Sequence, residues 1–273
     1  MSLLSWNCRG LGNSHIVNAL KEVIRIEKPK IFFLMETKSN RDWMEKIRDR
    51  CGFKHGLIVP SMGNSGGLAL FWKDEIQVNV IKYSMCNIDA EVNSGDGYGW
   101  SHLTGFYGNP DTSRRTESWN LLKYLSGLSQ FPWLVIGDFN EIVGLSEKEG
   151  GADRPTQQMQ NFIDTLNCYG LHDLGFTGPK FTWLYQKVDG SQIRERLDRV
   201  VATVEWTIKF PQAKLFHKSS SSSDHNPLVL QLVKEKIIPK HPKIFWFEAM
   251  WLKDSSCEEV VTSAWDEGLF MGS

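Results

Sequence analysis

Short apolar runs that end in polar residues recur along this chain. Residues 133–136 are apolar, and they are followed by Gly137, Asp138 and, two positions after the aspartate, Asn140. An unbroken apolar run of this length indicates a buried strand. Side chains at i and i+2 of an extended segment point the same way, so Asp138 and Asn140 are expected to leave the strand end together. The alternative is a turn in which both side chains bond to their own backbone.

The first part of the chain alternates such runs with amphipathic segments. Residues 2–7 and 31–35 are expected to form strands, and the second run ends in a carboxylate, Glu36. A helix capped by Ser14 is expected between them, and a second helix after Ser39, because apolar residues recur there at helical spacing. These apolar positions are Ile16, Leu20, Val23 and Ile24 in the first helix and Trp43, Met44 and Ile47 in the second. This alternation indicates layered helices and strands.

From Gly66 the pattern changes to short runs separated by turn residues, which is typical of antiparallel strands. Strands are expected at 68–72, 76–82, 87–93 and 98–107, with residues 94–97 as a hairpin turn, and later at 180–186, 191–201 and 226–233. Helices are expected from Trp119 to Leu128, before the strand that ends at Asp138, and at 156–168. The second half thus repeats the theme of the first without a detectable sequence repeat.

Residues 234–243 are basic and contain Pro239 and Pro242, which is typical of a linker. Beyond them, Ser255 and Glu258 have the spacing of a capping box that opens a short helix ending at Trp265. We therefore expect one domain over residues 1–234, and over 235–273 a linker and the start of a truncated downstream region.

Composition limits the functional classes. The net charge is −1, so any binding of nucleic acid has to come from local basic patches. Five scattered cysteines without a Cys-x-x-Cys pair indicate reduced thiols in an intracellular protein instead of a disulfide framework or a zinc site. No apolar run approaches the length of a membrane span, and the N-terminus lacks the apolar core of a secretion signal.

Polar residues collect at the predicted strand ends. A histidine next to a carboxylate, as in Asp224-His225, can be held in one tautomer and kept cationic near neutral pH. Each residue alone has an ordinary explanation as a turn or surface residue, and the ordered set is what points to a site. The set comprises Asn7, Glu36, Tyr107, Asp138, Asn140, Asp198, Asp224 and His225.

This ordered set resembles the endonuclease/exonuclease/phosphatase superfamily, whose fold is DNase I-like. The motifs that carry the resemblance lie between Ser5 and about Leu232 and follow the order of the family. They are residues 5–10 (SWNCRG), 35–37 (MET), 106–108 (FYG), 137–140 (GDFN), 181–183 (FTW), 197–199 (LDR) and 223–227 (SDHNP). The chain is most similar to endonuclease domains of plant non-LTR, LINE-type retrotransposons. The resemblance implies an α+β fold, a four-layer α/β/β/α sandwich of two mixed β-sheets flanked by helices.

The resemblance also implies roles for these residues. Glu36 would be the metal carboxylate, with Asn7 and Asp224 as direct or water-mediated ligands. All of them offer oxygen, which suits Mg²⁺ or Mn²⁺. The catalytic group would comprise His225 on the scissile phosphate, held by Asp198, Asp138 activating the water, and Asn140 and Tyr107 orienting the phosphate. Accounts of the family exchange the roles of Asp138, His225 and the metal, and the sequence does not choose among them.

Substrate-binding residues are expected among basic and polar groups near these motifs. They are Arg114, Arg115, Thr182 and Arg199, with Lys187, Arg194 and Arg196 near Asp198. Lysines and arginines that merely solvate the surface are the alternative. Arg9 stands where abasic-site repair relatives carry an acidic residue, so repair specificity is not expected. The serine run 219–223 predicts a loose loop before His225.

The expected function is a metal-dependent phosphodiesterase, a DNA endonuclease that nicks DNA to leave a 3′-hydroxyl for a retroelement. The reverse transcriptase that would use this end is absent from the chain, and nuclear localisation and a monomer are expected. Two alternatives remain open. One is a phosphatase or RNA phosphodiesterase on the same fold, because fold does not fix substrate. The other is a catalytically silent fragment that binds nucleic acid or protein.

Overall fold

The structure is a computed structural model that describes residues 1–63, 65–95, 97–232 and 256–269, the last range with side chains up to residue 263. By its contacts the chain divides into two units, Met1–Lys234 and Glu235–Ser273. In the second unit the described residues form helix α6, Cys257–Leu269. The expected linker at 234–243 and the expected capping residue Ser255 lie outside the described residues.

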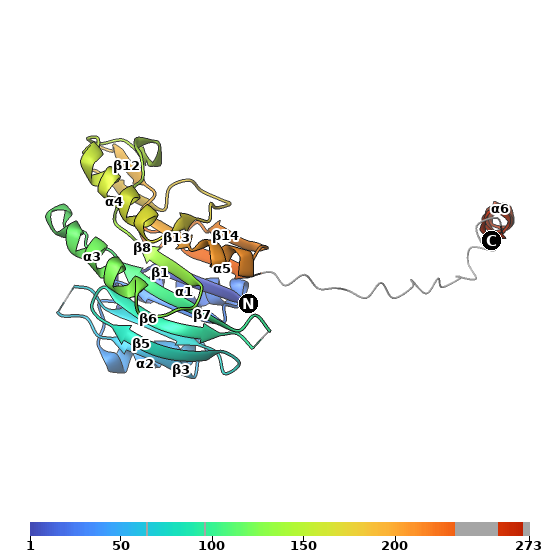
Figure 1. Cartoon of the computed structure of the whole chain (residues 1–273), viewed down its shortest axis with the longest axis horizontal. Helices are drawn as coiled ribbons and strands as arrows, with labels where there is room; N and C mark the ends of the chain where they lie inside the picture. The colour runs from blue at the N-terminus through green and yellow to red at the C-terminus, as the bar shows by residue number, and fades with distance from the viewer. Residues whose placement is uncertain (64, 96, 233–255, 270–273) are drawn as a thin grey trace. The chain divides into compact units, whose positions relative to one another are not determined.

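Two six-stranded sheets form the first unit (Figure 1). The first sheet consists of β1 (Ser2–Asn7), β2 (Ile31–Met35), β3 (His55–Val59), β4 (Leu68–Trp72), β14 (Ala213–His217) and β15 (Leu228–Leu232). Its order is β14-β15-β1-β2-β4-β3. β1 and β2 pair in parallel, and the other neighbours are antiparallel, so the sheet is mixed.

The second sheet is also mixed, with six strands and one parallel pair. It consists of β5 (Gln77–Tyr83), β6 (Asn87–Asn93), β7 (Trp100–Tyr107), β8 (Trp133–Asp138), β10 (His172–Asp173) and β13 (Asp198–Ala202). Its order is β10-β13-β8-β7-β6-β5, with β7 and β8 as the parallel pair. A small third sheet joins β9 (Lys148–Glu149), β11 (Trp183–Gln186) and β12 (Gln192–Glu195).

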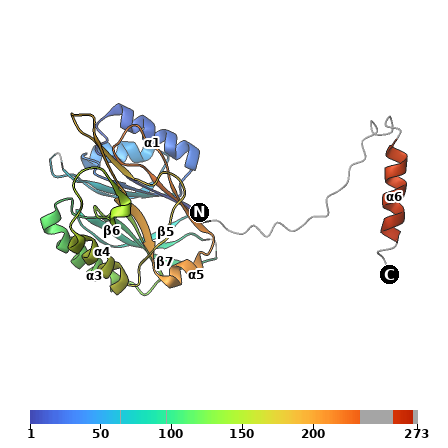
Figure 2. The ribbon, with the colours of Figure 1, turned by 90° about the horizontal axis from the view of Figure 1, so that it is seen from above.

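Helices cover the outer faces of both sheets. They are α1 (Ser14–Glu27), α2 (Arg41–Arg50), α3 (Arg115–Ser126) and α4 (Thr156–Cys168). The short helix α5 (Val204–Lys209) instead packs its Trp206 into the core between the sheets, and the 3-10 turns are η1 (Thr112–Arg114) and η2 (Leu145–Glu147). Figure 2 shows α1 on one side of the strands and α3 and α4 on the other. Leu20 of α1 packs with Phe32 of the first sheet, while Phe162 of α4 packs with Val135 of the second. The architecture is therefore the expected α/β/β/α sandwich.

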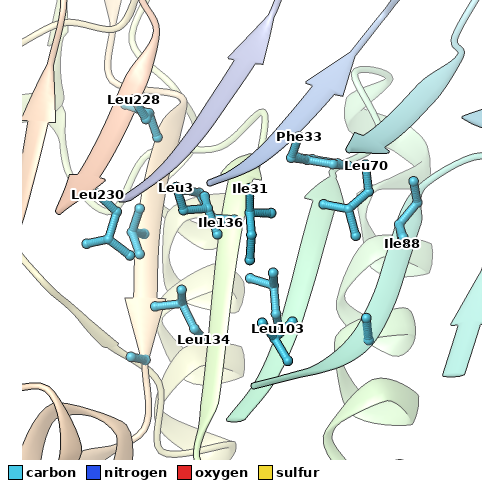
Figure 3. Close-up of a cluster of buried hydrophobic side chains, with 14 of the residues drawn as sticks. Leu3, Ile31, Phe33, Leu70, Ile88, Leu103, Leu134, Ile136, Leu228 and Leu230 are labelled. Carbon is cyan, nitrogen blue, oxygen red and sulfur yellow. The ribbon is translucent and has the colours of Figure 1, made fainter. Parts of the chain in front are cut away.

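The main hydrophobic core lies between the two sheets. Leu3 and Ile31 of the first sheet pack with Leu103 and Leu134 of the second, and Figure 3 shows these side chains facing one another. The central strands β1, β2 and β8 are buried on both faces, against the facing sheet and against helices. This double burial explains why their sequences are nearly continuous apolar runs. Among the described residues no helix is long and apolar enough to cross a membrane.

Several sequence predictions need correction. The helix caps are Asn13 and Asn40, whose side chains accept from His15 and Trp43 backbone N–H groups, so the expected caps Ser14 and Ser39 were wrong by one residue. The segment expected as one strand at 191–201 forms two strands, β12 and β13, in different sheets. The strands β3 and β14 and the helix α5 were not predicted, because edge elements are only partly buried and carry a weak pattern.

Gly137 sets the path of the chain into Asp138. Its φ is +148°, and an added Cβ would lie 1.9 Å from the Phe106 carbonyl oxygen. We expect Gly137→Ala to lower the free energy of unfolding by about 2–3 kcal/mol, because backbone in a packed sheet has to shift. Urea denaturation measures the effect. Gly170→Ala is the control, since its φ is +62° but nothing lies within 4 Å, and it should lose only about 1 kcal/mol. Equal losses would contradict the role of the close contact.

Candidate active site

Six strand ends meet at one edge of the sandwich. β1, β2, β7 and β8 arrive there with their carboxyl ends, since Asn7 pairs with Met35 and Tyr107 pairs with Asp138. β13 and β15 run antiparallel to β8 and β1 and therefore begin at this edge, with Asp198 opposite Asp138. Asn7 Nδ2 donates to Asp138 Oδ2 over 3.0 Å, so the edges of the two sheets are in contact. The fold thus gathers residues from distant parts of the sequence.

The centre of the site is an imidazole between two carboxylates. His225 Nδ1 lies 2.8 Å from Asp198 Oδ2, and its Nε2 lies 3.8 Å from Asp138 Oδ2. All three residues are at most 2% exposed. The backbone of His225 is fixed as well, because Trp6 Nε1 donates to its carbonyl oxygen at 2.9 Å. The ring is therefore held in one orientation, with Nε2 directed toward Asp138.

Asn7 joins this centre to Glu36. Its Nδ2 donates to Glu36 Oε1 at 3.1 Å and to Asp138 Oδ2 at 3.0 Å. Tyr107 donates its hydroxyl to the same Glu36 oxygen at 2.9 Å. Asn140 donates its backbone N–H to Asp138 Oδ1 at 2.8 Å and its side-chain Nδ2 to the Gly108 carbonyl. Asn7 and Tyr107 thus support Glu36 by donating to it, and Asn140 is oriented beside Asp138.

Asp224 lies at the exposed side of the cluster, where two cations also reach in. Its Oδ2 accepts from Trp183 Nε1 at 3.1 Å, and its Oδ1 lies 3.5 Å from Arg9 Nε. The same guanidinium reaches Glu36 Oε1 at 3.4 Å through Nη1. Lys38 Nζ lies 3.2 Å from Glu36 Oε2. Acidic and basic groups are therefore interleaved around Glu36.

Backbone strain collects in this site. Of the five non-glycine residues with positive φ in the described part of the chain, four belong to it: Arg9, Glu36, Lys38 and Asn140. The fifth, Lys28, is the C-cap of α1. Such conformations cost about 1–3 kcal/mol each and persist where the surroundings fix them, most often at functional sites.

The loop before His225 is anchored, so the expectation of a loose loop was wrong. Ser223 donates its hydroxyl to the Asn7 carbonyl at 3.0 Å and accepts from the His225 backbone N–H at 3.2 Å. Ser220 donates its backbone N–H to Asn226 Oδ1 at 3.0 Å. The small serine side chains allow this close approach of loop and strand end, and they hold His225 in place.

The surroundings shift the pKa values of the central groups. Burial lowers the pKa of His225, but the carboxylates of Asp198 and Asp138 outweigh it and raise that pKa to about 9. Burial and the charge of Asp198 raise the pKa of Asp138. Burial and the neighbouring Glu36 raise the pKa of Tyr107, which stays a neutral donor. Burial opposes ionisation of Glu36, but Arg9, Asn7 and Tyr107 together lower its pKa.

The donor set fits a divalent cation. Glu36 and Asp224 supply carboxylate oxygens, the ligands that Mg²⁺ and Mn²⁺ prefer. A cationic group, the Arg9 guanidinium, already stands between Glu36 and Asp224, which shows that their oxygens converge on a place for positive charge. Asp138, Asp198 and His225 also converge, with one ligand atom from each within 4.8 Å of the others. In that second group the His225–Asp198 hydrogen bond engages two of the donors.

The structure brings together most of the predicted site residues but not the substrate-binding group. Arg115 is buried against Glu141, and Arg199 is fully buried between Glu147 and Asp173. Both arginines are thus removed from any substrate surface, so those two expectations were wrong.

The other two members of that group differ from each other in exposure. The hydroxyl of Thr182 is buried and accepts the backbone N–H groups of Leu197 and Asp198, so it positions β13 instead of touching substrate. Arg114 is exposed and pairs with Glu117 one helical turn away, so its contact with substrate stays a prediction.

Two residues at the site were not predicted to belong to it. Lys38 and Arg9 both lie two positions after a predicted site residue, Glu36 and Asn7 respectively. That spacing is a weak signal, because it depends on a regular strand and both residues lie in turns of positive φ. Trp183, in the motif at residues 181–183, also reaches the site, because its indole N–H donates to Asp224.

Known proteins share this architecture. An AP endonuclease from Archaeoglobus fulgidus is 16% identical with a TM-score of 0.66, covering 86% of this chain and 100% of that one. The 3′ phosphatase NExo from Neisseria, bound to product DNA hairpin, is 14% identical with a TM-score of 0.63 and the same coverage. The endonuclease domain of TRAS1, a telomere-specific non-LTR retrotransposon, is 16% identical with a TM-score of 0.59, covering 86% and 99%. At these identities the likeness concerns the fold.

Curated protein sequences gave no match to this chain. A family profile does match the chain. The match begins in β1 at residue 4, spans the strand-end residues and ends at His225, the residue at the centre of the site. The matched region, residues 4–225, covers most of the first unit, and on this basis the chain belongs to the Endonuclease/Exonuclease/phosphatase family.

Proposed function

We propose that this chain is a Mg²⁺-dependent endonuclease that nicks DNA and leaves a 3′-hydroxyl, and that it derives from a non-LTR retrotransposon. The observation that carries the proposal is the buried cluster in which His225 lies between Asp198 and Asp138, while Asn7 joins Asp138 to Glu36. A held imidazolium beside a carboxylate suits a reaction in which a water is deprotonated while negative charge grows on a phosphate.

The residues divide the work of hydrolysis. Asp198 holds Nδ1 of His225, so Nε2 is the atom that donates to a non-bridging phosphate oxygen. Asp138, next to that Nε2, takes the proton of the attacking water. Asn140 presents its amide beside Asp138 because Gly108 fixes its orientation. Water attacks phosphorus in line, the bond to the 3′-oxygen breaks, and that oxygen takes a proton from solvent water, so the products are a 5′-phosphate and a 3′-hydroxyl.

Glu36 and Asp224 would hold the Mg²⁺, because their oxygens lie on either side of one guanidinium. A metal held there would supply Lewis-acid stabilisation of the charge on the phosphate and on the departing oxygen. Tyr107 and Asn7 serve this site indirectly, because each donates to Glu36 and fixes its carboxylate. This assignment gives Tyr107 a role on Glu36 instead of on the phosphate.

A cavity next to the cluster would receive the nucleotide that flanks the cut. It has a volume of about 320 Å³ and is bordered by Asp224. The rings of Phe181 and Trp183 line it, as do the cations Lys180 and Arg194. Aromatic rings stack with bases and cations bind the phosphate backbone, a combination typical of single-stranded nucleic-acid sites.

Three likenesses support DNA as the partner and a retroelement as the source. The motifs at residues 6–12 (WNCRGLG) and 137–141 (GDFNE) resemble those of plant non-LTR endonucleases, and the fold resembles that of the TRAS1 endonuclease domain. The NExo structure contains a DNA hairpin. We accordingly propose that the chain acts as a monomer in the nucleus, that residues 1–234 are the nuclease, and that a reverse transcriptase module uses the 3′-hydroxyl.

Relaxation of supercoiled plasmid by the full chain tests this function. We expect nicked circles with Mg²⁺ or Mn²⁺, none with EDTA, and loss of nicking in His225→Ala. A DNA polymerase should extend the nicks directly, since they carry a 3′-hydroxyl. Folded protein that does not nick DNA with either metal would contradict the proposal. Phosphate release from a phosphorylated inositol or a 3′-phosphate end would then indicate a phosphatase, and cleavage of RNA an RNA phosphodiesterase.

A further inference from the structure

The side chain of Arg9 spans the gap between two carboxylates of the proposed metal site. Its Nη1 lies 3.4 Å from Glu36 Oε1, and its Nε lies 3.5 Å from Asp224 Oδ1. Both distances exceed the usual length of a charge-assisted hydrogen bond, about 2.7–2.9 Å. The side chain is also 46% exposed. The guanidinium therefore lies loosely between the two oxygens, with an open path to solvent.

The backbone beneath Arg9 is firmly held. Cys8 donates its N–H to the Met35 carbonyl and Leu11 donates to the Thr37 carbonyl, so the turn is pinned on both sides of Arg9. The Arg9 N–H donates to Asn7 Oδ1, and its φ is +53°. A fixed backbone with a loose, exposed end group is suited to exchange, because the side chain can leave without unfolding the turn.

Lys38 carries the same charge as Arg9 but does not lie between the two carboxylates. Comparing the two residues therefore distinguishes the effect of positive charge from the effect of filling that space. Its Nζ forms an ion pair with Glu36 Oε2 at 3.2 Å. Arg9 instead contacts Oε1 of Glu36 and reaches Asp224 as well. Both cations reduce the negative potential of the site, but Arg9 takes up the space between the two carboxylates.

We propose that Arg9 is a tethered cation that occupies the site between Glu36 and Asp224 and has to leave it before a divalent metal binds there. The inference rests on the proposed metal site. It follows from competition for the same oxygens: Glu36 Oε1 already accepts from Asn7, Tyr107 and Arg9. Arg9 thereby sets the metal concentration that the site requires.

Binding of Mn²⁺ to the full chain without DNA tests this proposal, measured by electron paramagnetic resonance of the free ion. We expect Arg9→Gln to bind Mn²⁺ about fivefold more tightly than the wild type, the low end of typical couplings because the pair is partly exposed. Lys38→Gln should gain less, about twofold, since it removes charge without clearing the space. Arg25→Gln is the matched control: it breaks an exposed pair with Glu22 on α1 and should leave the affinity unchanged.

The outcomes separate the inference from the proposed function. Loss of Mn²⁺ binding in Glu36→Gln identifies the site, whether or not the protein cuts DNA. Unchanged or weaker Mn²⁺ binding by Arg9→Gln would overturn the inference, and so would an equal gain in Lys38→Gln, which would assign the effect to charge alone. Thermal unfolding with and without Mn²⁺ gives a second readout, because Arg9→Gln should show the larger metal-induced rise in Tm.

Discussion

Asp138→Asn is expected to slow phosphodiester hydrolysis by about 10²–10⁴-fold, the usual contribution of a general base. The substitution keeps the shape of the side chain, and an amide oxygen can still accept the Asn7 or Asn140 hydrogen bond. What is lost is the capacity to take a proton and the negative charge 3.8 Å from His225 Nε2. Cleavage of a DNA duplex under single-turnover conditions measures the rate.

The design has to separate the chemical step from metal binding. The rate is therefore compared at saturating Mg²⁺, after titration of each variant, because Asn7 links Asp138 to the metal carboxylate Glu36. Asp164→Asn is the matched control, since it makes the same change on the exposed face of α4, where Asp164 accepts a hydrogen bond from Gln160. A near-normal rate in folded Asp138→Asn would show that another group activates the water.

The strand-end residues could be predicted because they depend on simple periodicity. Ile31–Met35 and Trp133–Asp138 are buried on both faces, so their sequences are continuous apolar runs with a polar residue where the strand meets the edge. The positions of Glu36 and Asp138 follow from where those runs stop. The order of the motifs then led to the family, and the family to the sandwich.

The roles of the arginines could not be predicted from the sequence. No periodic pattern distinguishes an arginine on the surface from an arginine in a buried ion pair. Arg115 and Arg199 were expected to bind substrate. Instead they form buried ion pairs with Glu141 and Glu147, respectively. Those partners lie 26 and 52 residues away along the chain. Only the tertiary structure brings such pairs together.

The division of residues 191–201 illustrates a second limit. Residues 192–195 pair in the small third sheet, whereas Asp198 begins a strand of the second sheet. Arg196 and Leu197 make the transition between them, and their composition does not mark a turn. The break has a consequence for the site, because the hydroxyl of Thr182 holds the N–H groups of Leu197 and Asp198 at this point and fixes the carboxylate that binds His225.

A buried ion network lies behind Asp198. Glu147 Oε1 accepts from Arg196 Nη1 at 2.8 Å, and its Oε2 accepts from Arg199 Nη2 at 2.7 Å and from the Val143 backbone N–H at 2.9 Å. The two arginines flank Asp198 in sequence, so this network anchors the start of β13. Asp173 is the other carboxylate partner that both arginines share.

We expect Glu147→Ala to lower the free energy of unfolding by about 3–5 kcal/mol, the usual cost of removing one partner from a buried pair. Arg199 is fully buried, so its charge would be left with Asp173 as its remaining carboxylate partner and without water to replace the lost one. Urea denaturation measures the change. Glu117→Ala is the control, because Glu117 pairs with Arg114 where both side chains are about 60% exposed, and it should change stability by less than about 1 kcal/mol. A loss below about 1 kcal/mol in Glu147→Ala would mean that water or a side-chain shift satisfies Arg199, and that the network does not hold Asp198 in place.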